Sequence, residues 1–353
     1  MCWFMRWRGS VTALYQRVWA VGWDDGTVTS SPAARRDRRW GVDPLTGLVL
    51  VALVAGLVVP VRGAGADVGR WAVTAAVVLL FFGYGVRTSR AELRDAVRAW
   101  RLQVSVLVAT FVVFPVLGVG AHLVPGLGDL SGGVLYLALL PSTVQSSVVL
   151  TSIAQGNVPG AITAATASNI IGIVATPVLV MLSGSVLMGR AGSGLGPGAL
   201  VGVLTHLVLP FTVGQVAQRW WGPWLKGHSR VTKVTDRGTV VLVVYVSVSE
   251  ATVSGAWTRL TPGHLAVLLA VCAVLLAVML LVTWHGGAWL GLPRADRITL
   301  LMCGSKKSLA TGLPMASVLF VPAVAASVAL PVIVFHQLQL AVCAVLARRL
   351  SDG

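Results

Sequence analysis

The chain has 353 residues, of which 56% are hydrophobic and 11% are charged, and its mean hydropathy is +0.83. Soluble domains carry about 25% charged residues, so this composition excludes an ordinary soluble protein. The formal net charge is +15. Most Lys and Arg lie in short segments between apolar runs, which indicates membrane loops and argues against a nucleic-acid partner.

Residues 1–43 differ from the rest of the chain. They hold seven arginines, including the cluster "RRDRR" at 35–39. The apolar run that follows is not succeeded by a small-residue cleavage site, so a signal peptide is not indicated. We predict a basic, disordered cytoplasmic tail.

Apolar runs of about 20 residues, the length that spans a bilayer as a helix, recur from there on. They are too long and too uniform for the alternating strands of a membrane barrel. They predict ten transmembrane helices, at residues 44–61, 71–86, 102–121, 133–154, 158–184, 197–217, 238–255, 263–284, 298–318 and 322–347.

The distribution of basic residues orients these spans. With the N-terminus inside, the two tails and the inside loops carry 21 of the 27 Lys and Arg, the outside loops carry 4, and two lysines stay within an apolar segment. Nine or eleven spans would mix these counts. Because cytoplasmic loops collect Lys and Arg, we expect a multi-pass protein of a bacterial plasma (inner) membrane with both termini cytoplasmic, including the short tail 348–353.

Two polar stretches interrupt this pattern, "LLPSTVQSSVVLTSIAQGN" (139–157) in the fourth span and "LLMCGSKKSLATGLPM" (300–315) in the ninth. They are five helices apart, and an odd displacement inverts the second relative to the first. Backbone freed by a break must line protein or water, and interrupted segments at matched places indicate an inverted-repeat transporter. We predict an all-α fold of two inverted five-helix repeats, 44–187 and 197–347, with helices 4 and 9 broken.

The polar side chains of these stretches are candidates for binding a substrate or an ion. A single Pro or Ser in a membrane helix is more often a kink or a packing residue, but two dense polar runs at matched places favour a site. The candidates are Ser142, Thr143, Gln145, Ser146, Ser147 and Thr151 in the first stretch and Ser305, Lys306, Lys307, Ser308 and Thr311 in the second.

Two lysines within a span need a reason, because a charge at mid-membrane costs about 2.5–3.5 kcal/mol on insertion scales. The simple alternative is that both extend from a helix end to water. Glu250 is the one acid placed clearly inside a span. It could be a coupling acid, a partner of a lysine or a solvated group at the outer rim.

At these residues the chain resembles the bile acid:sodium symporter family (solute carrier family 10), and most of all its seventh vertebrate-type branch. The phrases "LLPSTVQSSVVLTSIAQGNVPGAI", "SNIIGIVATPVLV" and "CGSKKSLATGLPMASVLF" carry the resemblance, which covers about residues 44–347. It implies a mobile core domain and a panel domain, with the broken helices 4 and 9 crossing near the midplane. It also implies that a small organic anion crosses the bilayer by alternating access together with sodium.

The sequence departs from the family where sodium would bind. The resemblance implies a glutamate and a glutamine in the second broken helix, and this chain has lysines nearby instead. Ser146 and Ser147 match a Ser-Asn pair of the first break, and Thr166, Ser168 and Asn169 are the neighbouring polar groups of the fifth helix. We expect one lysine to lie among carbonyl groups as a built-in cation and the other to face a cavity and attract the anion. Sodium, a proton or no ion at all remain open as the coupled species, with no other cofactor expected.

The residues allow two other classes of function. A Ser-Lys hydrolase would need Ser305 or Ser308 beside Lys306 or Lys307 in a water-filled pocket, which leaves the matched repeat without a role, so we predict no enzyme. The resemblance also implies a second candidate, a non-transporting regulator or sensor of calcium homeostasis on a transporter scaffold. The substrate and the oligomeric state cannot be read from the sequence.

Overall fold

The structure is a computed structural model that describes residues 44–88, 100–183, 201–255, 257 and 260–351. The predicted tail 1–43 lies outside the described residues. Every regular element within them is helical, and no strand occurs among them. The predicted all-α class is confirmed.

The helices follow the predicted apolar segments in order. The first half of the chain contains α2 (Pro44–Val58), α3 (Ala64–Arg87), α5 (Trp100–Val108), the π-helix η2 (Ala109–Val113), α6 (Phe114–His122), η3 (Gly128–Leu130), α7 (Ser131–Leu139), α8 (Gln145–Ile153) and α9 (Val158–Leu182). The second half contains η5 (Leu204–Val208), α12 (Leu209–Gly227), α13 (Ser229–Val253), α14 (Pro262–Trp289), α15 (Arg294–Gly304), α16 (Leu309–Leu319) and α17 (Pro322–Ser351).

Six of the described helices are long and apolar enough to cross a bilayer by length and composition. They are Ala64–Arg87, Trp100–His122, Val158–Leu182, Val201–Leu225, Pro262–Trp289 and Ser327–Ser351. The fourth and ninth predicted spans do not count among them, because each is divided into two short helices. Several helices also extend beyond the predicted apolar segments, since α3 begins at Ala64 and α13 at Ser229.

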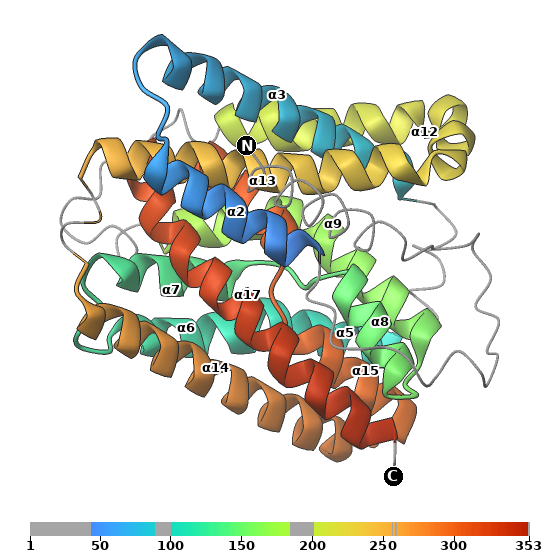
Figure 1. Cartoon of the computed structure of the whole chain (residues 1–353). Coiled ribbons are helices and arrows are strands. Elements are labelled where there is room, and N and C mark those ends of the chain that lie inside the picture. Colours follow the sequence, from blue (N-terminus) through green and yellow to red (C-terminus); the bar gives the residue numbers. More distant parts are fainter. Residues whose placement is uncertain (1–43, 89–99, 184–200, 256, 258–259, 352–353) are drawn as a thin grey trace, which may run out of the picture. The chain divides into compact units, whose positions relative to one another are not determined.

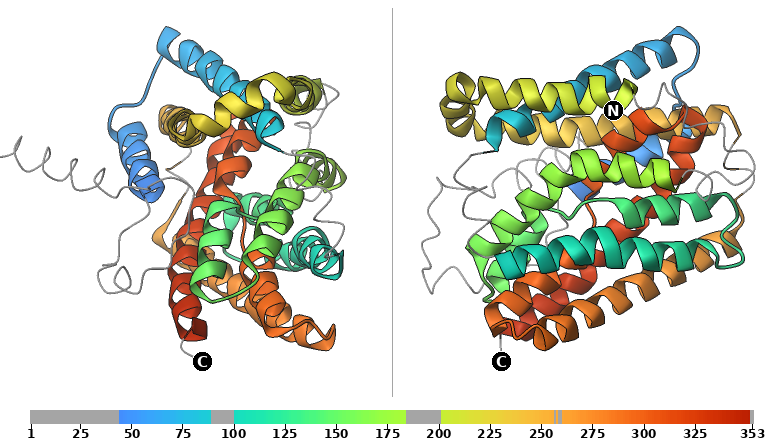
Figure 2. Two further views of the ribbon diagram at one scale, coloured as in Figure 1. Left: turned by 90° about the vertical axis from the view of Figure 1, so that its right-hand side faces the viewer. Right: turned by 180° about the vertical axis from the view of Figure 1, so that it is seen from behind.

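The helices between residues 51 and 353 form two groups (Figures 1 and 2). Helices α3, α12 and α13 lie side by side in one group, and the helices from α5 to α9 and from α14 to α17 form the other. Within the first group, Arg87 at the end of α3 donates two hydrogen bonds of 2.8 Å to the carboxylate of Asp236 in α13. This pair of short bonds joins two helices that are far apart in sequence.

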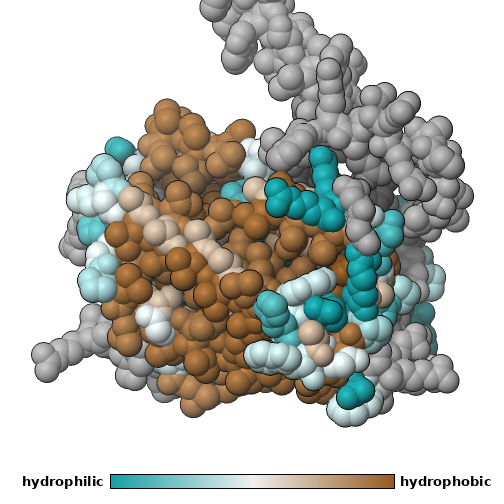
Figure 3. Space-filling model, turned by 90° about the horizontal axis from the view of Figure 1, so that it is seen from below, coloured by the Kyte–Doolittle hydropathy of each residue, from teal (hydrophilic) through white to brown (hydrophobic). Residues whose placement is uncertain are grey.

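A broad hydrophobic surface covers the face of the molecule seen in Figure 3, with hydrophilic residues gathered toward its edges. Exposed Leu265, Leu269, Val274 and Leu281 all lie on α14. Soluble monomers rarely expose apolar patches larger than a few hundred Å². The surface therefore suits contact with lipid.

Helices α3 and α12 approach each other through glycines. A Cβ atom added at Gly85 would overlap the Phe211 carbonyl oxygen, and one added at Gly214 would overlap the Phe82 carbonyl oxygen. At Gly83, two residues earlier on α3, the nearest atom is the flexible Arg87 side chain at 3.9 Å. Of these two glycines of α3, Gly85 is the one whose position requires the absence of a side chain.

We expect Gly85→Ala to destabilise the protein by about 1–3 kcal/mol, because the two backbones must move apart. Gly83→Ala is the matched control and should stabilise by up to about 1 kcal/mol through helix propensity. Melting temperatures of the purified proteins in detergent measure both. Equal effects of the two substitutions would contradict the close packing.

Candidate functional site

The two polar stretches form breaks that touch each other. Residues 140–144 separate α7 from α8, and residues 305–308 separate α15 from α16. The Ser308 amide donates to the Pro141 carbonyl oxygen at 2.9 Å, and the Ser142 hydroxyl donates to the Cys303 carbonyl oxygen at 2.5 Å. Polar groups that each break frees are thus bonded by the other break.

Lys307 is held in a cage of main-chain oxygens. Its side chain is 1% exposed. Its Nζ donates to the carbonyl oxygens of Thr110 (2.8 Å), Ala138 (2.8 Å) and Leu140 (2.7 Å) and lies 4.2 Å from the centre of the Phe114 ring. An ammonium group has three donors, and all three are used. The group therefore sits where a small bound cation would find carbonyl ligands.

Local sequence explains why the Thr110 carbonyl oxygen has no hydrogen bond within its own helix and can accept from Lys307. In the π-helical turn the Phe114 amide bonds the Ala109 oxygen, so it cannot bond Thr110. The next residue is Pro115, which has no N–H. The Thr110 carbonyl thus has no helical donor. Single π-helical turns of this kind occur frequently at functional sites.

The other two oxygens come from the frayed end of α7. Pro141 cannot donate, and the Leu140 amide closes a tight turn onto Leu137. The Ser142 amide, which would reach Ala138 in a continuous helix, instead donates to the Ser168 hydroxyl at 3.0 Å. Ala138 and Leu140 are left to accept from Lys307.

Gln339 of α17 fixes the backbone of Lys307. Its side-chain oxygen accepts from the Lys307 amide at 2.8 Å, and its side-chain nitrogen donates to the Lys307 carbonyl oxygen at 2.8 Å. The same nitrogen lies 2.9 Å from Nδ1 of His336. The amide of one glutamine thus replaces the two helical hydrogen bonds that Lys307 lacks.

Lys306 is in a different environment. It is completely buried, and its Nζ has no hydrogen-bond partner within the described part of the chain. The expectation of one lysine among carbonyl groups agrees with the placement of Lys307. The expectation that the other faces a cavity is wrong for this structure, and so is the alternative that both reach water, because packing encloses both side chains.

The hydroxyl groups of the first break bond one another and the second break. The Thr143 hydroxyl lies 2.8 Å from the Ser146 hydroxyl and 2.9 Å from the Ser147 hydroxyl. The Ser147 hydroxyl donates to the Met302 carbonyl oxygen at 3.0 Å. The Asn169 side chain donates to the Ser142 carbonyl oxygen at 2.7 Å. The structure thus brings these predicted residues together with Ser168.

The remaining candidate residues differ in burial and in hydrogen bonding. Thr166 is half-buried on α9, and Gln145 is exposed at the start of α8. Thr151 and Thr311 are buried with hydroxyls that lack a hydrogen bond among the described residues.

Neither serine of the second break bonds a lysine amine. The Ser305 hydroxyl donates to the Leu301 carbonyl oxygen at 2.5 Å, and the Ser308 hydroxyl accepts from the Thr311 amide and caps α16. The hydroxyl-to-amine contact that a Ser-Lys dyad needs is not formed by either.

Glu250 pairs with an arginine and not with a lysine. It accepts a hydrogen bond of 3.1 Å from Arg70, which also bonds Asp67. Together with Arg62 and Val321, Arg70 and Glu250 line an open cavity of about 400 Å³. The described partner of Glu250 is thus an arginine and not a lysine, and a coupling role or a place at the outer rim stays a prediction.

The prediction missed the groups that hold Lys307. They are backbone oxygens and one ring, from Thr110, Ala138, Leu140 and Phe114. Only Pro115, inside an apolar span, signalled that a carbonyl of that helix lacks its donor. Gln339, which bonds the backbone of Lys307, is not among the candidates of the two polar stretches.

The oxygens near the breaks take part in hydrogen bonds. The hydroxyls of Ser146 and Ser147 bond Thr143, and the carbonyl oxygens at the contact of the breaks accept from Lys307. None of the described ion pairs brings a carboxylate to these breaks. A sodium ion near Ser146 and Ser147 stays a prediction.

Comparison with known proteins gives the family. The model of the SBF-like CPA transporter family matches residues 43–352. "Uncharacterized protein PA2026" of Pseudomonas aeruginosa is 40% identical over 313 residues, which are 87% of this chain and 92% of that protein. "Putative symporter YfeH" of Escherichia coli is 40% identical over 311 residues, with 87% and 92% covered.

A more distant relative carries the bile-acid name. "Sodium/bile acid cotransporter 7" of Rattus norvegicus is 26% identical over 278 residues, covering 77% of this chain and 80% of that protein. The resemblance read from the two polar stretches is therefore confirmed along nearly all of the described chain. The chain belongs to the SBF-like CPA transporter family.

Proposed function

We propose that this protein is a secondary-active transporter that moves a small organic anion across the plasma membrane by alternating access. The observation that carries the proposal is the ammonium group of Lys307, held by three carbonyl oxygens where two broken helices meet. A membrane protein retains a buried charge of this kind where the site serves transport more often than where it serves stability.

The proposed architecture is ten helices in two inverted repeats. In this arrangement α7–α8 and α15–α16 are the crossed broken helices of a core that also contains α5, α6, α9, α14 and α17. Helices α3, α12 and α13 belong to the panel against which the core moves. The grouping of helices in Figures 1 and 2 supports this division.

Lys307 takes the role of a permanently bound cation in this proposal. The name of one relative includes sodium, and in this chain an ammonium group occupies the cluster of carbonyl oxygens. Transport then does not depend on sodium, and a proton gradient or the anion gradient drives it.

Uptake into proteoliposomes tests the proposal. Radiolabelled taurocholate, a C4 dicarboxylate and a small aromatic carboxylate are offered in choline or sodium buffer, with and without a pH gradient. We expect at least one anion to accumulate at the same rate in both buffers. Uptake that requires sodium would overturn the role of Lys307, and uptake of no anion by folded protein would overturn transport.

The regulator of calcium homeostasis is the second candidate. It rests on the resemblance to the seventh branch and on no contact in the structure. The same proteoliposomes separate the two functions, because a regulator produces no solute flux above that of empty vesicles.

A further inference from the structure

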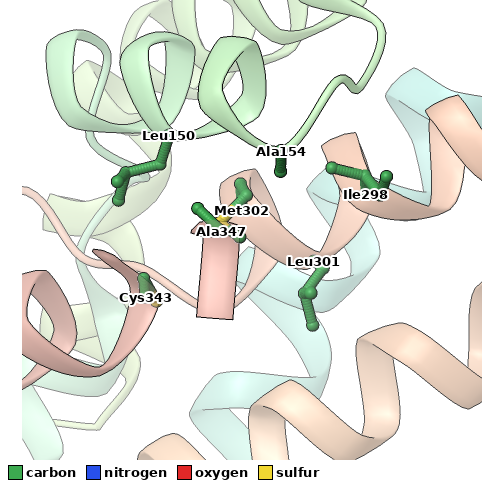
Figure 4. Packing of buried hydrophobic residues seen from close by; sticks show 7 residues of the cluster. All are labelled: Leu150, Ala154, Ile298, Leu301, Met302, Cys343 and Ala347. Atoms are coloured by element: carbon green, nitrogen blue, oxygen red, sulfur yellow. The ribbon is translucent and has the colours of Figure 1, made fainter. Parts of the chain in front are cut away.

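A closed hydrophobic cluster lies between α8, α15 and α17 (Figure 4). It is made of Leu150, Ala154, Ile298, Leu301, Met302, Cys343 and Ala347, all at most 7% exposed. Partly buried Leu280, Trp284 and Leu350 pack against it. The cluster joins the two broken helices to the last helix, on the side of the breaks where α15 begins.

Lys306 follows the cluster along the chain. It lies four residues after Met302, a member of the cluster, just beyond the end of α15. Its amine has no hydrogen-bond partner among the described residues, and none of the described ion pairs brings a carboxylate to it. Lys307 is the adjacent residue, and its own amine is turned to the three carbonyl oxygens described above.

The charged form of Lys306 has nothing to stabilise it in this arrangement. An isolated ammonium in a dry interior costs so much free energy that the group loses its proton instead. Lys307 is equally buried, but its three hydrogen bonds compensate the charge. The two adjacent lysines are equally buried, and they differ in the hydrogen bonding of the amine, which decides whether the charged form is stable.

We propose that Lys306 is a proton-binding site that the hydrophobic cluster opens and closes. While the cluster is closed the amine is neutral. When α8 and α15 separate from α17, water enters, the amine takes a proton from it, and the ammonium pairs with the anionic group of the substrate. The anion and the proton then cross together, which deepens the proposed function and rests on it.

Chemical access to the amine tests the first half of the proposal. Reductive methylation with formaldehyde and cyanoborohydride modifies neutral, accessible amines of the full-length protein, and tandem mass spectrometry separates Lys306 from Lys307. We expect Leu150→Ala, which thins the cluster, to raise the rate at Lys306 at least tenfold and to leave Lys307 unchanged. Leu80→Ala is the matched control, because Leu80 is a fully buried leucine of α3 outside the cluster.

A rate at Lys306 that stays as low in Leu150→Ala as in the wild type, with Lys307 still protected, would overturn the proposal. So would an equal increase at Lys306 in Leu80→Ala, because the cluster would then not control access. An unfolded sample is recognised by modification of Lys307 as well.

The pH dependence of stability tests the charge. If the enclosed amine is neutral, the unfolded chain binds one proton more than the folded chain, so folded wild type gains stability as pH rises. Lys306→Met lacks this proton. Between about pH 7 and about pH 9 the ratio of the unfolding constants, Lys306→Met to wild type, should rise by up to tenfold per pH unit. A ratio that does not change with pH would show a charged amine and overturn the proposal.

The two measurements use no substrate. Failure of both with intact anion uptake removes Lys306 from the cycle and leaves transport standing. Success of both without uptake of any anion leaves the gated amine standing and removes transport.

Discussion

Replacing Lys307 by alanine is expected to destabilise the protein by about 3–5 kcal/mol, the range for removing one partner of a buried charged interaction. The oxygens of Thr110, Ala138 and Leu140 lose their donor and stay buried, and each unsatisfied acceptor costs about 1–3 kcal/mol. Sodium should then recover part of the loss. A cation that binds only the folded state raises the melting temperature by mass action.

The measurement compares melting temperatures in sodium and choline buffers. We expect a rise with sodium for Lys307→Ala and none for the wild type, whose carbonyl oxygens are occupied. Lys306→Ala is the matched control, since it removes an equally buried lysine that makes no hydrogen bond, and sodium should not change its melting temperature. Stabilisation of the wild type by sodium would contradict the built-in cation.

Replacing Gln339 by leucine is expected to destabilise the protein by about 2–4 kcal/mol. The substitution preserves the approximate volume but leaves the Lys307 amide and carbonyl oxygen without partners in a buried break, and each such group costs about 1–3 kcal/mol. Thermal unfolding in detergent measures the loss. It should be accompanied by faster methylation of Lys307, because the backbone that aims the ammonium is released.

Gln337→Leu is the control for Gln339→Leu. Gln337 is two residues away on α17 and half-buried, and the hydrogen bonds described for Lys307 go to other residues. We expect its substitution to leave the methylation rate of Lys307 unchanged. An equal effect of the two substitutions would mean that any change in α17 exposes Lys307 and that Gln339 does not specifically hold the Lys307 backbone.

Patterns along the chain determined the positions of the helices. Apolar length gave the membrane segments, because about 20 residues span a bilayer. Pro141 and the run "CGSKKS" identified both interruptions, because a helix cannot keep its hydrogen bonds at a residue without an N–H and because lipid does not accept exposed polar backbone. These are local causes, so one sequence was enough to find them.

The contacts between segments could not be found in this way. Thr110 is 197 residues from Lys307, and Arg70 is 180 residues from Glu250. Which of the two lysines is caged depends on where the carbonyl groups of α7 and the π-helical turn are placed, and helical periodicity says nothing about that placement. The sequence likewise left several roles open for Glu250, and it is α3 that brings an arginine to it.

The sequence by itself therefore determined that this is a helical membrane protein with two matched polar breaks and two lysines in one of them. Only the tertiary structure decided that Lys307 is bonded by three carbonyl oxygens and that Lys306 is enclosed without a partner. The physical reason is that the free energy of a buried charge depends on the donors, acceptors and apolar groups that packing brings around it. Those groups come from helices that the chain reaches only after folding.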